Sequence, residues 1–167
     1  MTAGDFYALV EAARLSPVGD WNPPFCGDSH MRIARDGQWF HAGARIARPE
    51  LVRLFAGLLK REGGDYFLVT PVEKLSIAVE DAPFLAVAVD RRDGDLVFTT
   101  NAGDAVRLDG DHGLRMAGDT PYLHVRDGLD ARVARSAWYH LAAMAVPQAG
   151  MLGVTSGGSF FALGSAP

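Results

Sequence analysis

The sequence predicts an α+β fold of internally duplicated strands-plus-helix units with mainly antiparallel sheets. Three observations lead to this prediction. Short apolar segments with strand-like composition are separated by turn sequences rich in Gly, Asp and Asn. Two other segments repeat apolar side chains at helical spacing. Strands and helices also come in blocks and not in strict alternation, which favours α+β over a parallel α/β sheet.

Length, composition and charge narrow the class of protein. The 167 residues suit one domain or two small, tightly packed ones, and 49% hydrophobic residues supply an ordinary core. A net charge of −4 gives no global basic field, so nucleic-acid binding would need a local patch. The only cysteine, Cys26, excludes an internal disulfide. We see neither a signal peptide nor a membrane span, expect a cytoplasmic protein, and predict no cofactor.

Two halves are expected. Residues 1–70 should hold an N-terminal helix, a hairpin and a second helix, whereas residues 71–167 should hold a β-rich half with a long helix at 129–145 and a final hairpin. The first helix rests on Asp5 as N-cap and on Phe6, Leu9, Val10 and Ala13 at helical spacing. The stretch 16–27, rich in Pro and Gly, is expected to be an ordered loop.

The clearest local signal is the Asp36-Gly37 pair, which predicts a two-residue type I′ hairpin turn between 31–35 and 38–41. This turn would set Ile33 opposite Phe40 on the core face. Trp39 would then lie on the other face, together with His30, Arg32 and His41.

The stronger helix prediction begins at Pro49. Leu51, Leu54, Phe55, Leu58 and Leu59 form an amphipathic stripe, and Gly63-Gly64 is expected to end the helix. Strands are expected at 66–69, 75–79, 84–89, 96–100, 105–108 and 122–126, and a final hairpin at 151–155 and 160–163. On the 129–145 helix, Arg132, Arg135 and Tyr139 share one stripe.

Short echoes suggest a duplication. Arg48 and Arg126 each stand where a helix is expected to open, and each helix is followed by a strand ending in Val-Thr, at Val69-Thr70 and Val154-Thr155. Echoes this short are common by chance, so they support duplication only weakly.

A set of longer phrases, read in order, resembles a known family. The phrases are Trp21-Asn22-Pro23-Pro24, Cys26-Gly27-Asp28, Met31-Arg32-Ile33 with Asp36-Gly37 and Trp39-Phe40, Leu68-Val69-Thr70-Pro71-Val72-Glu73-Lys74, Val79-Glu80-Asp81-Ala82-Pro83-Phe84, Tyr122-Leu123-His124-Val125-Arg126-Asp127-Gly128-Leu129 and Ser156-Gly157-Gly158-Ser159-Phe160-Phe161. Together they resemble the bacterial domain-of-unknown-function family 1285. The resemblance covers about residues 21–164 and implies an internal duplication, with a C-terminal half superficially like pleckstrin-homology domains. It implies no established activity; a cleft between the halves and a role in signalling are what it suggests.

Catalytic chemistry has little support. Asp28, His30 and His41 could form a two-His-one-carboxylate metal set, but Arg32 in their midst would repel a cation. Cys26 lacks an assigned base, and no helix follows Ser156 to make a nucleophile elbow. A sheet surface in which Trp39 packs on an arginine stem is the simpler interpretation of the hairpin face.

Arginines at expected helix starts call for an explanation, because the helix dipole disfavours cations there. Arg48, Arg126, Arg132 and Arg135 either pair with carboxylates such as Glu73, Glu80 or Asp127, or bind an anion.

The leading hypothesis is a non-enzymatic binding or regulatory module for an unknown protein or anionic ligand. Its predicted site lies between the halves and is lined by Arg32, Trp39, Arg48, Glu73, Lys74, Asn101, Arg126, Arg132 and Tyr139. One alternative is a single-stranded nucleic-acid surface that uses the arginines and Trp39. The other is a cryptic metal-dependent hydrolase.

Overall fold

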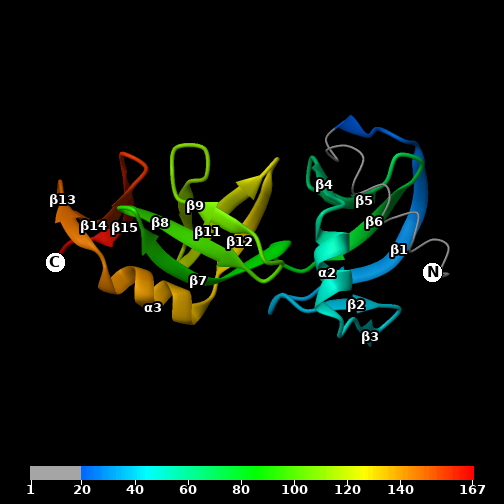
Figure 1. Ribbon diagram of the computed structural model, residues 1–167, viewed down its shortest axis with the longest axis horizontal. Coiled ribbons are helices and arrows are strands. Elements are labelled where there is room, and N and C mark those ends of the chain that lie inside the picture. Colours follow the sequence, from blue (N-terminus) through cyan, green and yellow to red (C-terminus); the bar gives the residue numbers. More distant parts are fainter. Residues whose placement is uncertain (1–19) are drawn as a thin grey trace. The chain divides into compact units, whose positions relative to one another are not determined.

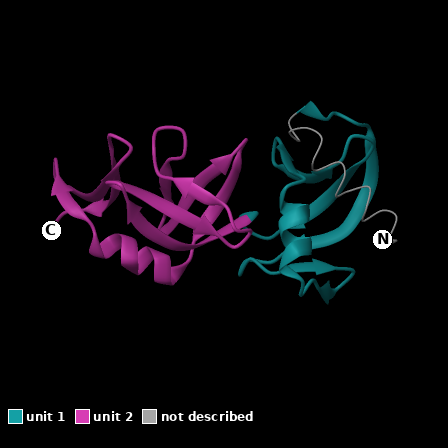
Figure 2. Ribbon diagram, viewed as in Figure 1, with its two compact units in different colours: residues 1–83 teal, residues 84–167 magenta. Residues whose placement is uncertain are grey.

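The computed structural model describes residues 20–167 and is dominated by strands, with two short helices in that range (Figure 1). The predicted N-terminal helix, with Asp5 and Phe6, lies outside the described residues. The chain divides into two compact units, residues 1–83 and 84–167 (Figure 2). The predicted division after Thr70 would have separated residues 74–79 from the strands with which they pair.

The described residues of unit 1, 20–83, form one six-stranded sheet and one helix. Strands β1 to β3 form a meander, helix α2 follows, and β4 to β6 form a second meander. The strands are β1 (Phe25–Ile33), β2 (Trp39–His41), β3 (Ala44–Arg45), β4 (Leu59–Glu62), β5 (Asp65–Val69) and β6 (Lys74–Val79), and the helix is α2 (Pro49–Ala56). The sheet order is β3-β2-β1-β6-β5-β4, so the first and last strands meet in the centre as a parallel pair.

Unit 2 contains a six-stranded sheet, a helix and a three-stranded sheet. Its strands are β7 (Phe84–Arg92), β8 (Asp95–Thr100), β9 (Ala105–Arg107), β10 (Leu114–Ala117), β11 (Thr120–Arg126), β12 (Leu129–Val133), β13 (Val146–Gln148), β14 (Met151–Ser156) and β15 (Ser159–Ser165), and its helix is α3 (Arg135–Ala143). The sheet orders are β10-β11-β12-β7-β8-β9 and β13-β14-β15. Again the first and last strands of the six, β7 and β12, form the central parallel pair.

The two six-stranded sheets therefore have the same topology, which supports the predicted duplication. The echoes that suggested it do not correspond, however. Arg48 precedes α2, whereas Arg126 ends β11; Val69 lies in β5, whereas Val154 lies in the three-stranded sheet. Duplication is visible in the pairing order and not in those short phrases.

The first hairpin differs from its prediction by one residue. Ala34 and Gln38 close a three-residue loop in which Gly37, but not Asp36, has positive φ, and the Asp36 side chain accepts a hydrogen bond from Gln38 N. Ile33 therefore faces Trp39. Since a one-residue slip exchanges the faces of a strand, Trp39 moves into the core and Phe40 to the opposite face.

Helix α2 ends seven residues before the predicted stop at Gly63. Pro49 opens it as expected, but Gly57 is its C-cap, and Leu59 starts β4. The Gly63-Gly64 pair instead turns β4 into β5, with Leu59 opposite Leu68. Leu58 and Leu59, which suggested a longer helix, are fully buried without one.

The predicted helix 129–145 is also too long. Asp127 and Gly128 both have positive φ and form a two-residue turn from β11 into β12. Leu129, Ala131 and Val133 are buried while the residues between them are half-buried, which is the alternation of a strand. Helix α3 starts only at Arg135 and packs on β7 through the buried Ala137 and Leu141. The predicted strands from 66 to 126 and the final hairpin are confirmed.

Candidate binding face on unit 2

Five of the nine predicted site residues belong to unit 1, and the structure explains two of them as structural. Trp39 is 2% exposed and stacks on Phe55 of α2, with ring centroids 6.4 Å apart. The prediction that Trp39 offers a surface for a ligand is therefore wrong. Arg32 lies over the Phe40 ring at 4.3 Å and pairs with Glu80 at 2.5 Å.

The other three residues of unit 1 do not gather around Arg32. Arg48 is exposed at the start of α2, where its carbonyl accepts from Leu51 N. Glu73 closes a turn through its backbone, which bonds to Thr70. Lys74 pairs with Glu62 at 2.7 Å and not with its neighbour Glu73. The hydrogen bond from Lys74 holds the pKa of Glu62 below its usual value.

In unit 2, Asn101 and Arg126 both adjoin the start of β7. The Asn101 side chain accepts a hydrogen bond from Leu85 N at 3.0 Å, and the backbone N–H of Asn101 donates to Leu85 O. The Arg126 guanidinium lies 5.9 Å from the Phe84 ring centroid. Burial lowers the pKa of Arg126, and the nearby carboxylates of Asp104 and Asp127 oppose that shift. This cluster braces the first residues of the central strand.

Arg132 and Tyr139 do not share a helix stripe, because Arg132 is in β12 and Tyr139 in α3. Tyr139 is 64% exposed. Arg132 is half-buried and is the cross-strand partner of Tyr122 in β11. This register connects Arg132 to a group of side chains that the sequence analysis did not single out.

That group is the β10–β12 face, made of Arg115, Tyr122, His124, Asp130 and Arg132. Register places Tyr122 of β11 directly between Arg115 of β10 and Arg132 of β12. Leu123, Ala131 and Val133 point into the core, so their sequence neighbours occupy the opposite side of the sheet. The Arg115 guanidinium lies 4.6 Å from the Tyr122 ring centroid, within cation–π range.

One carboxylate links the polar side chains of this face. Asp130 Oδ2 accepts from Arg115 at 3.0 Å, and Asp130 Oδ1 lies 3.2 Å from His124 Nδ1. The Asp130 side chain is 17% exposed, whereas that of Arg115 is 59% exposed. Arg115 and His124 thus share a single, more deeply set carboxylate, and Arg132 lies on the same face as the cross-strand partner of Tyr122.

The proposed metal set is not assembled. His30 lies 3.6 Å from Asp28, but positive φ at His30 breaks the alternation that would align it with His41. Within residues 20–167, no three His, Cys, Asp or Glu side chains are placed to hold a metal ion. Cys26 is exposed and its thiol donates to the Pro24 carbonyl.

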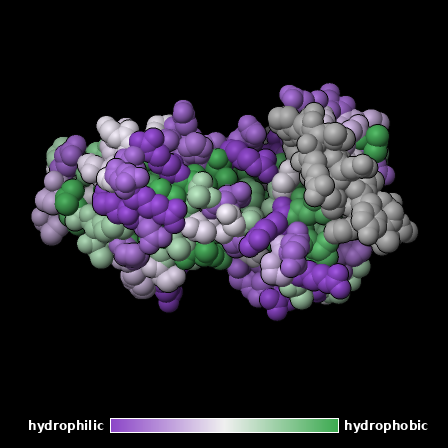
Figure 3. Space-filling view, viewed as in Figure 1, coloured by the Kyte–Doolittle hydropathy of each residue, from purple (hydrophilic) through white to green (hydrophobic). Residues whose placement is uncertain are grey.

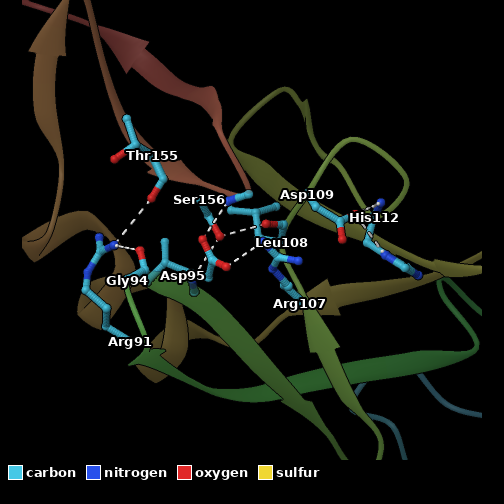
Figure 4. A network of polar contacts seen from close by, with 11 residues as sticks. Arg91, Gly94, Asp95, Arg107, Leu108, Asp109, His112, Thr155 and Ser156 are labelled. Carbon is cyan, nitrogen blue, oxygen red and sulfur yellow. Dashed lines mark hydrogen bonds and ion pairs between the residues drawn. The ribbon is translucent and has the colours of Figure 1, made fainter.

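Ser156 serves packing. Its buried hydroxyl donates to Leu108 O at 2.6 Å and accepts from Leu96 N at 2.8 Å, which ties β14 to β8 and to the end of β9 (Figure 4). Gly157 N donates to Asp95 Oδ1 at 2.8 Å. We call Asp95, Leu96, Leu108, Ser156 and Gly157 the Ser156 cluster. It fastens the three-stranded sheet to the six-stranded sheet within unit 2.

On the molecular face seen in Figure 3, hydrophilic side chains cover much of unit 2, with smaller hydrophobic areas among them. In the part of the chain that the structure describes, no helix is long and apolar enough to cross a membrane.

Fold and site define a class of protein: a mainly β, internally duplicated chain whose second unit carries a basic sheet face. The chain belongs to the DUF1285 family of unknown function; the model of its N-terminal domain matches residues 16–82 and that of its C-terminal domain matches residues 83–163. This confirms the resemblance seen in the sequence.

Two solved structures are similar to this chain. A DUF1285 family protein from Silicibacter pomeroyi DSS-3 is 46% identical, with a TM-score of 0.85, over 94% of both chains. A DUF1285 family protein from Shewanella baltica OS155 is 31% identical, with a TM-score of 0.60, over 66% of this chain and 87% of its own. A comparison with curated proteins finds no match.

Proposed function

We propose that this protein is a non-enzymatic binding or regulatory module that holds an anionic group on the β10–β12 face. The observation that carries the proposal is the placement of Arg115 and Arg132 on either side of Tyr122. Guanidinium groups form charge-assisted, often bidentate hydrogen bonds to carboxylates and phosphates. Neighbouring strands lie about 4.8 Å apart, so the two arginine Cα atoms are roughly 10 Å apart. Two such long side chains can reach one anion between them.

Local charge supports the same use. The chain has a net charge of −4, yet this face carries two arginines and one aspartate, Arg115, Arg132 and Asp130. An acidic protein with a local basic face attracts anions to that face and repels them elsewhere. A regulatory or signalling role, a cytoplasmic location and a pleckstrin-homology-like second unit remain predictions that go with this proposal.

Two observations argue against the nucleic-acid alternative and against the hydrolase alternative. The stacking platform for single-stranded nucleic acid required an exposed Trp39, which is buried against Phe55. The hydrolase required Asp28, His30 and His41 as one ligand set, which the described residues do not form.

The test is a titration of ¹⁵N-labelled protein with pyrophosphate, followed through the arginine Nε–Hε resonances. We expect saturable shifts at Arg115 and Arg132, while Arg53, exposed on α2, serves as the internal reference. Shifts at Arg115 and Arg132 no larger than those at Arg53 would overturn the proposal. Preference for a mixed oligonucleotide, with affinity falling steeply with salt, would instead support the nucleic-acid alternative.

A further inference from the structure

The position of Asp130 leads to a more specific hypothesis, which rests on the proposed function. Its two carboxylate oxygens engage Arg115 of β10 and His124 of β11 at the same time. We propose that Asp130 stands in for the ligand in the free protein and so makes the β10–β12 face select a phosphate dianion over a monovalent carboxylate.

Depth and reach distinguish Asp130 from its partners. Asp130 is 17% exposed, His124 37% and Arg115 59%, so an anion arriving from solvent meets the Arg115 and His124 side chains before it meets Asp130. The hydrogen bonds to Asp130 are 3.0 and 3.2 Å long, a geometry that an incoming acceptor must replace or share.

A carboxylate from solution would accept the same hydrogen bonds that Asp130 already accepts. Asp130 is tethered in β12 within bonding distance of both partners, so its effective concentration there reaches the millimolar range or above. A dilute acetate or a peptide carboxylate carries the same single charge and loses this competition. Monovalent anions are therefore excluded by an internal competitor.

A phosphate monoester differs in charge and in the number of acceptors. It carries about −1.5 to −2 charges at neutral pH and has three terminal oxygens. These can accept from Arg115, from His124 and from Arg132, which the register places on the far side of Tyr122. Asp130 contacts Arg115 and His124 in the structure. The dianion would add an interaction with Arg132, and its higher charge would strengthen its interactions with the two guanidinium groups.

The discriminating experiment compares wild type with Asp130→Asn and with Asp119→Asn, a matched control on the exposed β10–β11 turn. Inorganic phosphate and acetate are the probes, at constant ionic strength, and the Arg115 and Arg132 resonances are the readout. We expect wild type to bind phosphate and not acetate. Asp130→Asn should bind phosphate about tenfold more tightly and acetate measurably, because it removes a negative charge within a few ångströms of the anion. Asp119→Asn should stay within about twofold of wild type.

The other outcomes distinguish a failure of the role of Asp130 from a failure of the proposed function. Equal affinities in Asp130→Asn and Asp119→Asn would overturn the role of Asp130 but leave the proposed function standing. Absence of phosphate binding in all three proteins would overturn the proposed function itself. If Asp130→Asn does not fold, Asp130→Thr repeats the test with an uncharged residue that favours strands. O-phosphoserine and a phosphoserine peptide then distinguish a small ester from a modified protein as the source; binding of either supports the proposal, and failure of both overturns it.

Discussion

The two six-stranded sheets share one strand order, β3-β2-β1-β6-β5-β4 and its counterpart β9-β8-β7-β12-β11-β10. The Leu59–Leu68 pair of unit 1 corresponds to the Leu114–Leu123 pair of unit 2. With these pairs aligned, the corresponding outward positions are Lys60 and Arg115, Phe67 and Tyr122, Ser76 and Arg132, and Lys74 and Asp130. Both units thus have an aromatic residue at the centre of this face, and the charged residues around it differ between the units.

In both units a cation lies against the aromatic ring and pairs with a carboxylate, but the cation and the carboxylate are on exchanged strands. In unit 1 the carboxylate of Glu62 is on β4 and the cation that covers the aromatic ring, Lys74, is on β6, 4.7 Å from the Phe67 centroid. In unit 2 the cation Arg115 is on the outer strand and Asp130 is on the inner one. Unit 2 also has an arginine, Arg132, opposite its aromatic residue, where unit 1 has Ser76. The two sheets therefore share one strand order and differ in the charged residues on this face.

The units also differ in what completes their cores. Unit 1 uses helix α2, whose Phe55 stacks on Trp39. Unit 2 has a turn where unit 1 has α2 and uses instead α3 and the three-stranded sheet held by the Ser156 cluster. An apolar contact and a polar one should respond differently to substitution and to pH.

The largest effect is expected for Trp39→Ala. Removing this 2%-exposed ring should lower the free energy of unfolding by about 3–5 kcal/mol, because a cavity is left beside Phe55. Hydrogen exchange should accelerate in unit 1 far more than in unit 2. Equal acceleration in both units would show that they unfold together, which would contradict the view that each unit has its own core.

A smaller effect is expected for Gly157→Ala in unit 2. A Cβ at Gly157 would come within 2.7 Å of Asp109 Cβ, whereas a Cβ at Gly158 would meet nothing within 4 Å. Both residues have positive φ, so Gly158→Ala matches the backbone strain without the clash. We expect Gly157→Ala to be less stable than Gly158→Ala by roughly 1–3 kcal/mol in denaturant unfolding. Equal stabilities would mean that the β14–β15 turn does not press on Asp109.

Acid should weaken unit 2 through Asp95. The hydrogen bond from Gly157 N, helped by Arg107, holds the pKa of Asp95 below the ordinary value of 3.8. A lowered pKa stabilises the fold at pH above the unfolded value, and that contribution is lost as pH falls through the folded one. Asp95→Asn should therefore lower Tm at pH 7 and flatten the decline of Tm below about pH 4. The Tm of Asp119→Asn, measured over the same range, should follow that of wild type.

The sequence predicted strands better than helices, for physical reasons. Burial alternates along 96–100, and 66–69 is a short continuous apolar run; both patterns are typical of strands, and both strands are where they were expected. Leu59 also fits a helical stripe, but it pairs with Leu68 in the hairpin that turns at Gly63-Gly64, and this pairing makes it part of a strand. Of the two Asp-Gly pairs, Asp127-Gly128 forms the two-residue turn, whereas Asp36-Gly37 lies in a three-residue loop.

The candidate site was predicted only through Arg132. Assigning 129–145 to one helix hid the alternation of Leu129, Asp130 and Ala131, and the short strand holding Arg115 was not expected at all. His124 and Asp130 become neighbours only when β11 and β12 pair. Long-range register, which the spacing of residues does not reveal, is what assembles this face.

The role of the β10–β12 face in anion binding is tested most directly by measuring the phosphate affinity of two double variants. Arg115→Gln with Arg132→Gln should abolish phosphate binding to unit 2, because it removes both guanidinium groups of the β10–β12 face. Lys60→Gln with Lys74→Gln removes the same number of charges from the corresponding face of unit 1 and should leave binding within about twofold of wild type. Equal losses of affinity in the two double variants would contradict the claim that the β10–β12 face is the binding site.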